Sequence, residues 1–331
     1  MPELPEVEFT ARQLRATVLN ATIQDVHVFW ERTIGTLDAP TFRSLLAGQS
    51  LLEVRRRGKY LLIDLGHARA PELLMTIHRR MTGNLYLLPP GWEIDTSLRL
   101  EDAAAWNTRG PDFRYASFAQ KREQAGVPVL VREAEAMYYD PADLSHCRVC
   151  FDFADGRRLL FNDARKFGRI ELWPTEREAE ALTGLGPEPL SDEFTVEVLT
   201  GSLSTRKGPI KAVLLDQQVV AGLGNIYADE ALFLARIHPL RPANSLTEEE
   251  LMRLRDSIVS VLAAGIEYGG TTFSGYRGLS GEQGENYDHL KAYHRAGESK
   301  ICIRCGGLIA SQVIAQRTAH FCPHCQRLTS E

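Results

Sequence analysis

The chain has 331 residues, of which 44% are hydrophobic and 24% are charged, and its net charge is −5. This composition excludes an intrinsically disordered chain and a fibrous repeat, and the length is that of about two domains with a sizeable core. No run of about 18 uncharged apolar residues occurs, which excludes a membrane-spanning helix. The slight negative charge excludes no class of partner, because binding to nucleic acid needs only a local basic face.

The start of the chain and its cysteine content indicate the compartment. The opening MPELPEVE is acidic and rich in proline, unlike the basic and apolar start of a secretory signal peptide. Six cysteines are too few for a disulfide scaffold of this size. We therefore expect a cytoplasmic protein and, because no segment has the pattern of an oligomerisation element, a monomer.

In chain order, the first half has the pattern of one helix followed by antiparallel strands. Apolar residues from Val7 to Val18 recur at helical spacing, which predicts an amphipathic helix over residues 5–19. Short β-type runs follow at residues 22–29, 51–55, 60–65, 85–88 and, as a hairpin with an Asp-Gly turn, 148–163. This order predicts a mostly antiparallel β domain over residues 1–183, with a peripheral insertion at about 97–141.

The second half changes to a helical period after a linker. Turn formers dominate GLGPEPLS, and we place the linker at residues 184–200. Thr247 and Glu250 form a capping box ahead of a buried helical stripe, and we expect a helical domain over residues 201–290. Seven glycines between positions 265 and 284 predict a mobile loop, either functional or simply disordered.

Four cysteines near the C-terminus have the spacing of one structural Zn²⁺ site. Cys302 and Cys305, then sixteen residues, then Cys322 and Cys325 form the two CxxC pairs of a tetrahedral four-thiolate centre. A closed shell of this kind folds its segment and does not catalyse. Residues 291–331 carry six basic and two acidic side chains, so we expect a zinc finger that contacts phosphate.

Cys147 and Cys150 beside His146 form a third CxxC pair, which we interpret as ordinary strand cysteines. Side chains three positions apart on a strand point to opposite faces of the sheet. On this reasoning the pair cannot hold one metal ion.

A helix predicted to begin at Asn225 follows the turn AGLG, whose glycines can adopt positive φ. Such a start presents free N–H groups and the positive end of the helix dipole to an anion. Arg206, Lys207 and Lys211 lie upstream and would add charge. The pattern is equally that of an ordinary helix start, so the sequence leaves both interpretations open.

The N-terminus permits a specific chemistry. Removal of the initiator methionine would expose the secondary amine of Pro2, and an α-amine with a pKa of about 8 is neutral far more often than a lysine. Such an amine can attack an electrophilic sugar carbon and form an iminium. Glu3 could serve as general acid, with Glu6 one helical turn further on. The same residues are also simply favoured in a first helical turn, which leaves the matter open.

Several motifs, in one order along the chain, resemble a single enzyme family. They are PELPEVE at 2–8, RRRGKYLL at 55–62, MTGNLYLLPPG at 81–91, DARKFG at 163–168, GLGPEPLS at 184–191, VAGLGNIYADEAL at 220–232 and AQR before CPHC. They are similar to the Fpg/Nei family of bifunctional DNA glycosylases and AP lyases, and within it to the formamidopyrimidine-DNA glycosylases. The resemblance spans nearly the whole chain except residues 97–141.

The resemblance implies an α+β fold. It comprises an N-terminal helix with an antiparallel β-sandwich, a helix–two-turn–helix domain and a C-terminal β-hairpin zinc finger. The implied activity is base-excision repair: removal of oxidised purines (formamidopyrimidine, 8-oxoguanine), then β,δ-elimination at the abasic site. The implied partner is double-stranded DNA with oxidised bases or abasic sites, at the nucleoid of a bacterial-type cytoplasm.

Family roles transfer to the matching positions. Pro2 matches the Schiff-base nucleophile, Glu3 the acid, Lys59 the cation that supports β-elimination, and Arg317 the residue associated with δ-elimination. The family's phosphate-contacting positions correspond here to His78, His146, Arg206 or Lys207, and Asn225. The positions whose side chains enter the duplex correspond to Met81, Arg165 and Phe167. An enzyme that extrudes a nucleotide must fill the gap, which suits apolar wedges and one donor. The loop at about 271–288 matches the segment that closes over the flipped base.

The chain departs from the family pattern at three residues. Arg79 and Arg80 stand between the histidine and the wedge methionine, where the family has small or apolar residues. They would add phosphate contacts or alter the wedge. His294 replaces a glycine before the finger and could reshape the approach to the lesion.

Two other functions stay open on the sequence alone. One is a catalytically silent protein that binds DNA lesions or structures, which intact Pro2, Glu3 and Lys59 argue against and a retained Met1 would favour. The other is an endonuclease VIII-like glycosylase for oxidised pyrimidines, which the PELPEVE start disfavours.

Overall fold

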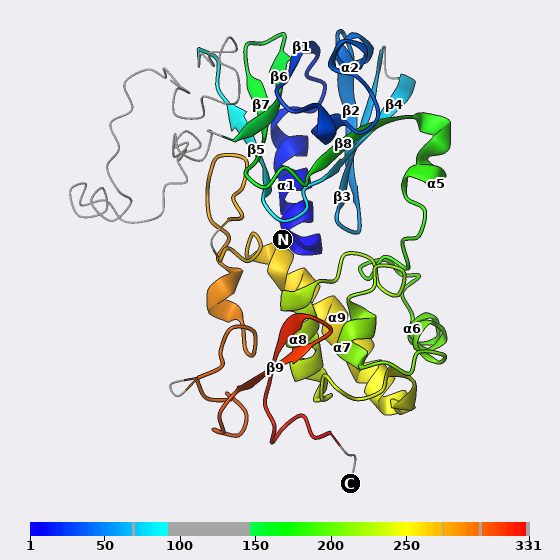
Figure 1. Ribbon diagram of the computed structural model, residues 1–331, viewed down its shortest axis with the longest axis vertical. Coiled ribbons are helices and arrows are strands. Elements are labelled where there is room, and N and C mark those ends of the chain that lie inside the picture. Colours follow the sequence, from blue (N-terminus) through cyan, green and yellow to red (C-terminus); the bar gives the residue numbers. More distant parts are fainter. Residues whose placement is uncertain (68–69, 92–145, 274, 298–299, 329–331) are drawn as a thin grey trace, which may run out of the picture.

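The computed structural model describes residues 1–67, 70–91, 146–273, 275–297 and 300–328. Two lobes lie one above the other, and helix α1 (Leu4–Thr17) runs from the upper lobe to their junction, where the N-terminus lies (Figure 1). The insertion expected at about 97–141 falls outside the described residues. Of the helices in the described ranges, none combines the length and hydropathy that a bilayer crossing requires.

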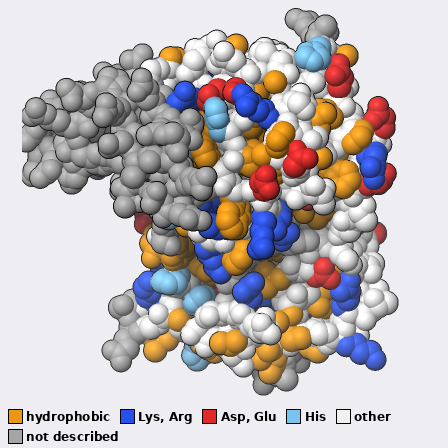
Figure 2. Space-filling model, turned by 45° about the horizontal axis from the view of Figure 1, so that its top comes forward, with side chains coloured by type: hydrophobic (Ala, Val, Ile, Leu, Met, Phe, Trp, Pro, Cys, Tyr) orange, Lys and Arg blue, Asp and Glu red, His pale blue; other side chains and the backbone are white. Residues whose placement is uncertain are grey.

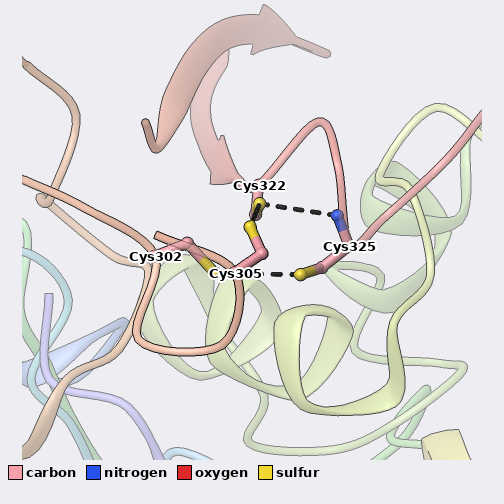
Figure 3. A group of neighbouring side chains, drawn as sticks. All are labelled: Cys302, Cys305, Cys322 and Cys325. Atoms are coloured by element: carbon pink, nitrogen blue, oxygen red, sulfur yellow. Dashed lines mark hydrogen bonds between the residues drawn. The ribbon is translucent and has the colours of Figure 1, made fainter. Parts of the chain in front are cut away.

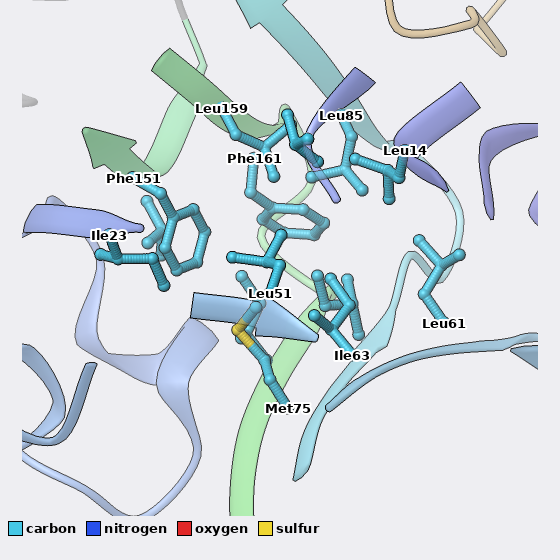
Figure 4. Packing of buried hydrophobic residues seen from close by; sticks show 14 of the residues in the cluster. Leu14, Ile23, Leu51, Leu61, Ile63, Met75, Leu85, Phe151, Leu159 and Phe161 are labelled. Atoms are coloured by element: carbon cyan, nitrogen blue, oxygen red, sulfur yellow. The ribbon is translucent and has the colours of Figure 1, made fainter. Parts of the chain in front are cut away.

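The upper, N-terminal lobe is a sandwich of two antiparallel four-stranded sheets, with strand orders β2-β3-β4-β8 and β1-β6-β7-β5. The strands are β1 (Ile23–Val28), β2 (Ser50–Arg57), β3 (Tyr60–His67), β4 (Ala70–His78), β5 (Gly83–Leu88), β6 (Cys147–Phe153), β7 (Arg158–Asp163) and β8 (Arg169–Pro174). Short helices flank them: η1 (Glu31–Ile34), α2 (Ala39–Leu46), η3 (Thr175–Arg177) and α5 (Glu178–Ala181). Aliphatic and aromatic side chains from both sheets fill the space between them (Figure 4).

The predicted helix and strands of this lobe are present, and the structure adds two strands that the sequence pattern does not predict, β4 and β8. Every residue of β4 from Leu74 to His78 is buried, so this strand lacks the alternation of apolar and polar residues that marks a half-buried strand. Strand β8 is largely half-buried and likewise alternates weakly. A central strand covered on both faces cannot be recognised by a period of two.

A β-bulge in β6 corrects the expected orientation of two cysteines. The register between β6 and β7 shifts between Cys147 and Val149, which adds one residue to β6. Cys147 and Cys150 therefore lie in one apolar cluster, not on opposite faces. The expectation that these side chains point to opposite faces was therefore wrong. Burial raises the pKa of the Cys147 thiol to about 12, which still favours ordinary buried cysteines.

The lower lobe is helical, with α6 (Val196–Leu203), α7 (Ile210–Leu214), α8 (Asn225–Ala235) and α9 (Glu248–Glu267). Helix α9 begins with the expected capping box, in which Thr247 and Glu250 exchange hydrogen bonds. Helix α6 begins inside the segment expected to be a linker, because the Thr195 side chain caps its first turn. The 3₁₀ turns η4 (Ala243–Ser245) and η5 (Asn286–His289) complete the lobe.

The C-terminal hairpin consists of β9 (Ala310–Ile314) and β10 (Arg317–Phe321). Its two-residue turn has Ala315 at φ 48° and Gln316 at φ 61°, the conformation that suits a tight hairpin. Asp229 of α8 accepts a hydrogen bond from the backbone of His320, 2.9 Å away. The hairpin is thereby fixed to the helix that begins at the lobe junction.

Helix α1 belongs to the cores of both lobes. Val7, Ala11 and Leu14 pack into the sandwich, whereas Leu4 packs with the helices of the lower lobe. The backbone N–H of Leu4 also donates to the carbonyl of Gly222, 3.0 Å away. The first turn of α1 is therefore the physical link between the two lobes.

The glycine-rich loop was expected to be mobile, and its described part is instead anchored to the N-terminal lobe. Tyr276 and Leu279 are buried, and Leu279 lies in the sandwich core. The Leu279 carbonyl accepts from the Leu87 N–H at 2.9 Å, and its N–H donates to the Gln13 side chain at 3.0 Å. Two buried apolar side chains offset the ordering entropy that the glycines add.

Gly222 tests the junction directly. It has φ +86°, and a Cβ there would lie 2.7 Å from the Leu4 side chain. We expect Gly222→Ala to lower the free energy of unfolding by roughly 2–4 kcal/mol, measured by urea titration. Gly201→Ala in α6 is the matched control, because no atom lies within 4 Å of its added methyl group. Equal stability of the two variants would contradict the proposed junction.

Candidate active site and nucleic-acid interface

Glu3 lies where the two lobes meet, buried against the first turn of α8. Its carboxylate accepts hydrogen bonds from the backbone N–H groups of Ile226 (3.0 Å) and Tyr227 (3.4 Å). A Cβ at Gly224 would lie 2.3 Å from the Glu3 carboxyl carbon, so only glycine permits this approach. The N-terminus of α8 thus holds a carboxylate of the chain itself, so these two N–H groups are not free to bind a separate anion.

Glu6 lies one turn further along α1 and joins three segments. One carboxylate oxygen accepts from the Glu3 N–H at 2.7 Å. The other accepts from the Tyr227 hydroxyl at 2.8 Å and from the Thr271 N–H at 2.7 Å. Because both oxygens are engaged by fixed donors, this geometry favours a holding role for Glu6 over proton transfer.

Lys59 comes from the tight turn between β2 and β3 and is buried beside these two carboxylates. Gly58, at φ +57°, lets the turn pack against the segment that precedes α8. Burial lowers the pKa of Lys59, the charges of Glu3 and Glu6 oppose this, and the charge of Arg317 adds to it. The structure therefore brings Glu3, Lys59 and the tip of the C-terminal hairpin into one electrostatic neighbourhood.

The N-terminal end of the chain reaches the same place. Pro2 is buried ahead of Glu3, whereas Met1 is partly exposed. Burial lowers the pKa of the Met1 α-amine, with Glu3 and Glu6 opposing and Lys59 adding to the effect. Burial also raises the pKa of the Glu3 carboxyl, against the effect of Lys59. Burial thus moves the pKa of each group toward its neutral form, and the neighbouring opposite charges limit both shifts.

Two adjacent turns of the sandwich expose apolar side chains. Met81 in the β4–β5 turn is 39% exposed and Phe167 in the β7–β8 turn is 50% exposed. The guanidinium of Arg165 lies over the Phe167 ring, 5.0 Å from its centroid. Buried Asp163 joins the turns by accepting from the Thr82 hydroxyl and from the Arg165 N–H. The structure thus brings together the three residues expected to enter the duplex.

His78 ends β4 and His146 precedes β6. The Nδ1 atom of His78 accepts from the Arg80 N–H at 3.1 Å, so its neutral ring carries its proton on Nε2. Burial, aided by the charges of Arg80 and Lys59, lowers the pKa of His78 to about 3. Burial also lowers the pKa of the half-buried His146. His78 is therefore a neutral hydrogen-bond donor at physiological pH.

The remaining expected phosphate contacts lie in the helical lobe. Arg206 forms an ion pair with Asp216 at 2.9 Å, and Lys207 is exposed. Asn225, the first residue of α8, donates from its side chain to the Thr318 carbonyl of the hairpin at 3.2 Å. The Asn225 side chain therefore faces the zinc finger.

The four C-terminal cysteines converge on one point, with their sulfur atoms all within 4.8 Å of one another (Figure 3). Sγ of Cys302 lies 3.8 Å from that of Cys325, and Sγ of Cys305 lies 3.5 Å from that of Cys322. A tetrahedral shell with Zn–S distances of about 2.3 Å has edges of about 3.8 Å, so the donor set fits one zinc ion. A zinc ion at this site would have a structural role, because four thiolates fill its coordination shell and leave no open position for a substrate.

Basic side chains gather across the middle of one face, where the two lobes meet (Figure 2). Four exposed cations belong to segments that carry the expected contacts: Arg80, Arg165, Lys207 and Arg317. A chain with a net charge of −5 thus has a local basic face. Such a face is the electrostatic condition for binding a phosphate backbone.

Comparison with known proteins places the chain in a family. Residues 1–170 match the formamidopyrimidine-DNA glycosylase N-terminal domain, residues 185–276 its H2TH domain, and residues 299–328 the zinc finger found in FPG and IleRS. The formamidopyrimidine-DNA glycosylase of Lactiplantibacillus plantarum is 38% identical over 330 residues, which cover 99% of this chain and 100% of the relative. The chain belongs to the formamidopyrimidine-DNA glycosylase family.

Two solved structures of the Lactococcus lactis family member share the fold. A variant in complex with Fapy-dG containing DNA has a TM-score of 0.77 and 30% identity, over 98% of this chain and 100% of that one. A complex with DNA that contains an abasic site has a TM-score of 0.76 and 30% identity, over 98% and 99%. The family resemblance, the α+β fold and the structural zinc site expected from the sequence are confirmed.

Sequence reasoning missed the buried acids of α8 in this family member. Asp229 pairs with fully buried Lys211, which therefore adds no free charge at the helix start, contrary to expectation. Glu230 accepts from the backbone N–H groups of residues 291–293 at 2.7–2.8 Å and so positions the segment before the finger. Two adjacent acids in a helix that is otherwise mostly apolar predict buried carboxylates with buried partners, and this pattern could have identified both contacts from the sequence.

The buried neutral His78 predicts a pH dependence of stability. Its pKa is about 3 in the folded chain and about 6.5 when unfolded, so protonation below pH 6.5 favours the unfolded state. The contribution of the neutral His78 to the free energy of unfolding is fully present above pH 6.5 and is lost as the pH falls toward 3. We expect a loss of about 2 kcal/mol between pH 7.5 and pH 5 that His78→Gln lacks, measured by urea unfolding. An identical pH dependence in both proteins would contradict the neutral burial.

Removal of zinc is expected to unfold the finger alone. Treatment with a strong chelator should abolish the slow amide exchange of β9 and β10 and leave that of the sandwich strands unchanged, because the metal holds only the finger. Cys305→Ser should lose the metal, and Cys150→Ser, whose thiol lies in the sandwich lobe, should retain about one zinc per chain. Equal zinc content in the two variants would contradict the assignment.

Proposed function

We propose that this chain is a base-excision repair enzyme that removes oxidised purines from double-stranded DNA and then cleaves the abasic site. One observation carries the proposal: Pro2 is buried directly before Glu3 at the lobe junction, and Lys59 is buried beside Glu3 and Glu6. Because its relatives are bacterial and the proposed substrate is double-stranded DNA, we place its action at the nucleoid of a bacterial-type cytoplasm.

The nucleophile in this proposal is the secondary amine of Pro2, freed by removal of Met1. The amine attacks C1′ of the damaged nucleotide, the bond to the base breaks, and the departing base takes a proton from solvent or a protein acid. Glu3 acts on the opened deoxyribose as general acid, which its raised pKa supports. The product of this step is an iminium that links the chain to the sugar.

Strand cleavage follows from the iminium, which acidifies the neighbouring C2′–H. Loss of that proton expels the 3′ phosphate in a β-elimination, and a second loss expels the 5′ phosphate in a δ-elimination. Lys59 supports the first elimination by its buried charge, and Arg317 supports the second from the hairpin tip. The charge of Arg317 acts on Lys59, which supports a role for the hairpin tip beside the same site.

Extrusion of the nucleotide is assigned to the two exposed turns. Met81 and Phe167 would enter the duplex, and Arg165 would donate to the orphaned partner base. Their exposure supports this role, because apolar side chains held outward on rigid turns cost little to insert between bases. The loop at about 271–288 would then cover the flipped base, since Thr271 at its start is held by Glu6 beside the site.

Phosphate contacts are assigned to His78, His146, Asn225 and either Arg206 or Lys207. The neutral Nε2–H of His78 can donate to a phosphate oxygen at any physiological pH. Between the two cations, the exposure of Lys207 favours it, because Arg206 is paired with Asp216. The zinc finger would contribute further cations to the backbone.

The test is chemical trapping of the iminium. Borohydride should link the chain covalently to duplexes with formamidopyrimidine, 8-oxoguanine or an abasic site, and leave an unmodified duplex free. Pro2→Gly should give no trapped species, whereas Pro5→Ala, a change in the same helical turn, should still be trapped. Failure of the wild-type chain with every lesion, after mass measurement shows Pro2 at the N-terminus, would leave a silent DNA-binding protein.

A further inference from the structure

Arg79 is a fully buried arginine in the turn that carries the exposed Met81. Its side chain is 1% exposed, and no ion pair in the described part of the chain includes it. Burial lowers its pKa, against the effects of Tyr276 and other nearby groups. The phosphate contact that the sequence suggested for Arg79 is therefore excluded in this conformation. A buried guanidinium without a bound carboxylate needs hydrogen-bond acceptors on every side.

Those acceptors come from three separate segments. The Nε–H of Arg79 donates to the Gly83 carbonyl at 2.7 Å, within its own turn. One terminal nitrogen donates to the Thr10 hydroxyl of α1 at 2.8 Å. The other donates to the Asn84 side-chain oxygen and, at 3.4 Å, to the Arg277 carbonyl in the glycine-rich loop. Arg79 thus connects the wedge turn, α1 and the loop.

Asn84 completes the connection from the sandwich side. Its side-chain oxygen accepts from the Arg277 N–H at 3.3 Å, and its amide donates to the Gly275 carbonyl at 2.5 Å. The Tyr276 ring lies between these loop residues and faces the guanidinium, 5.1 Å from its carbon. Residues 275–277 are therefore held by their backbone and by the one buried ring among them.

We infer that Arg79 is a positioning residue that clamps residues 275–277 against the N-terminal lobe in the free protein. The clamp sets the loop and the Met81 turn as one unit before any DNA is bound. If the loop lifted away, the buried guanidinium would lose a carbonyl and an aromatic face that nothing else in the described structure replaces. The consequence for catalysis rests on the proposed function, in which this loop covers a flipped base.

The direct test is hydrogen exchange of the free protein. In Arg79→Met, a change to an apolar side chain of similar length, the peptide over residues 275–282 should exchange about tenfold faster or more. Arg79→Lys should give an intermediate rate, because one ammonium cannot reach all the acceptors. Arg241→Met is the matched control. Among the described residues, the side chain of this buried arginine donates only to Ser245 and Glu250, so its loss should leave loop exchange unchanged.

The catalytic consequence is measured on the same variants. Arg79→Met should lower base removal from an 8-oxoguanine duplex about tenfold. Cleavage of a duplex that already contains an abasic site should be nearly unchanged, because it presents no base for the loop to cover. In Arg241→Met, the ratio of base removal to abasic-site cleavage should be the same as in the wild type.

The outcomes are distinguishable. Unchanged loop exchange in Arg79→Met would overturn the clamp, whatever the activities. Faster exchange with equal loss on both substrates would overturn the link to base recognition and assign the effect to the Met81 turn. If the wild type lacks both activities, the proposed function fails, while the exchange measurement still decides the clamp.

Discussion

The contact between the first turn of α1 and the first turn of α8 is the interaction on which the rest of this structure depends. Glu3 occupies the N–H groups of α8, and Leu4 packs in the core of the helical lobe while the rest of α1 packs in the sandwich. The free N–H groups of a helix start attract an anion, and here that anion is covalently part of the other lobe. One carboxylate therefore fixes the relative position of the two lobes and the place of the N-terminus.

The same burial prepares the chemistry. Removal of water penalises the charged form of any group, so it raises the pKa of Glu3 and lowers those of Lys59 and the α-amine. The pKa of an acid and that of a base thus both move toward the neutral form at one buried site. The mutual attraction of the Glu3 and Lys59 charges limits both shifts.

At the surface, two turns hold apolar side chains outward instead of burying them. Met81 and Phe167 are apolar yet exposed, and they stay outward because buried groups beneath them fix their turns. Asp163 ties the two turns together from below, and Arg79 ties one of them to α1 and to the glycine-rich loop. Exposed apolar side chains on preorganised turns lose little entropy when they enter another molecule.

The sequence by itself determined the local features whose physics needs only neighbours along the chain: the CxxC pairs, the amphipathic pattern of α1, the hairpin turn and the order of family motifs. Only the tertiary structure decided which face the β6 cysteines share, that Lys211 is buried with Asp229, and that the glycine-rich loop is anchored. The cysteine orientation depends on the β-bulge in β6, the burial of Lys211 on a partner in another helix, and the anchoring of the loop on the place of Leu279 in the sandwich core. Periodicity and spacing carry no information about contacts between residues that are far apart in the chain.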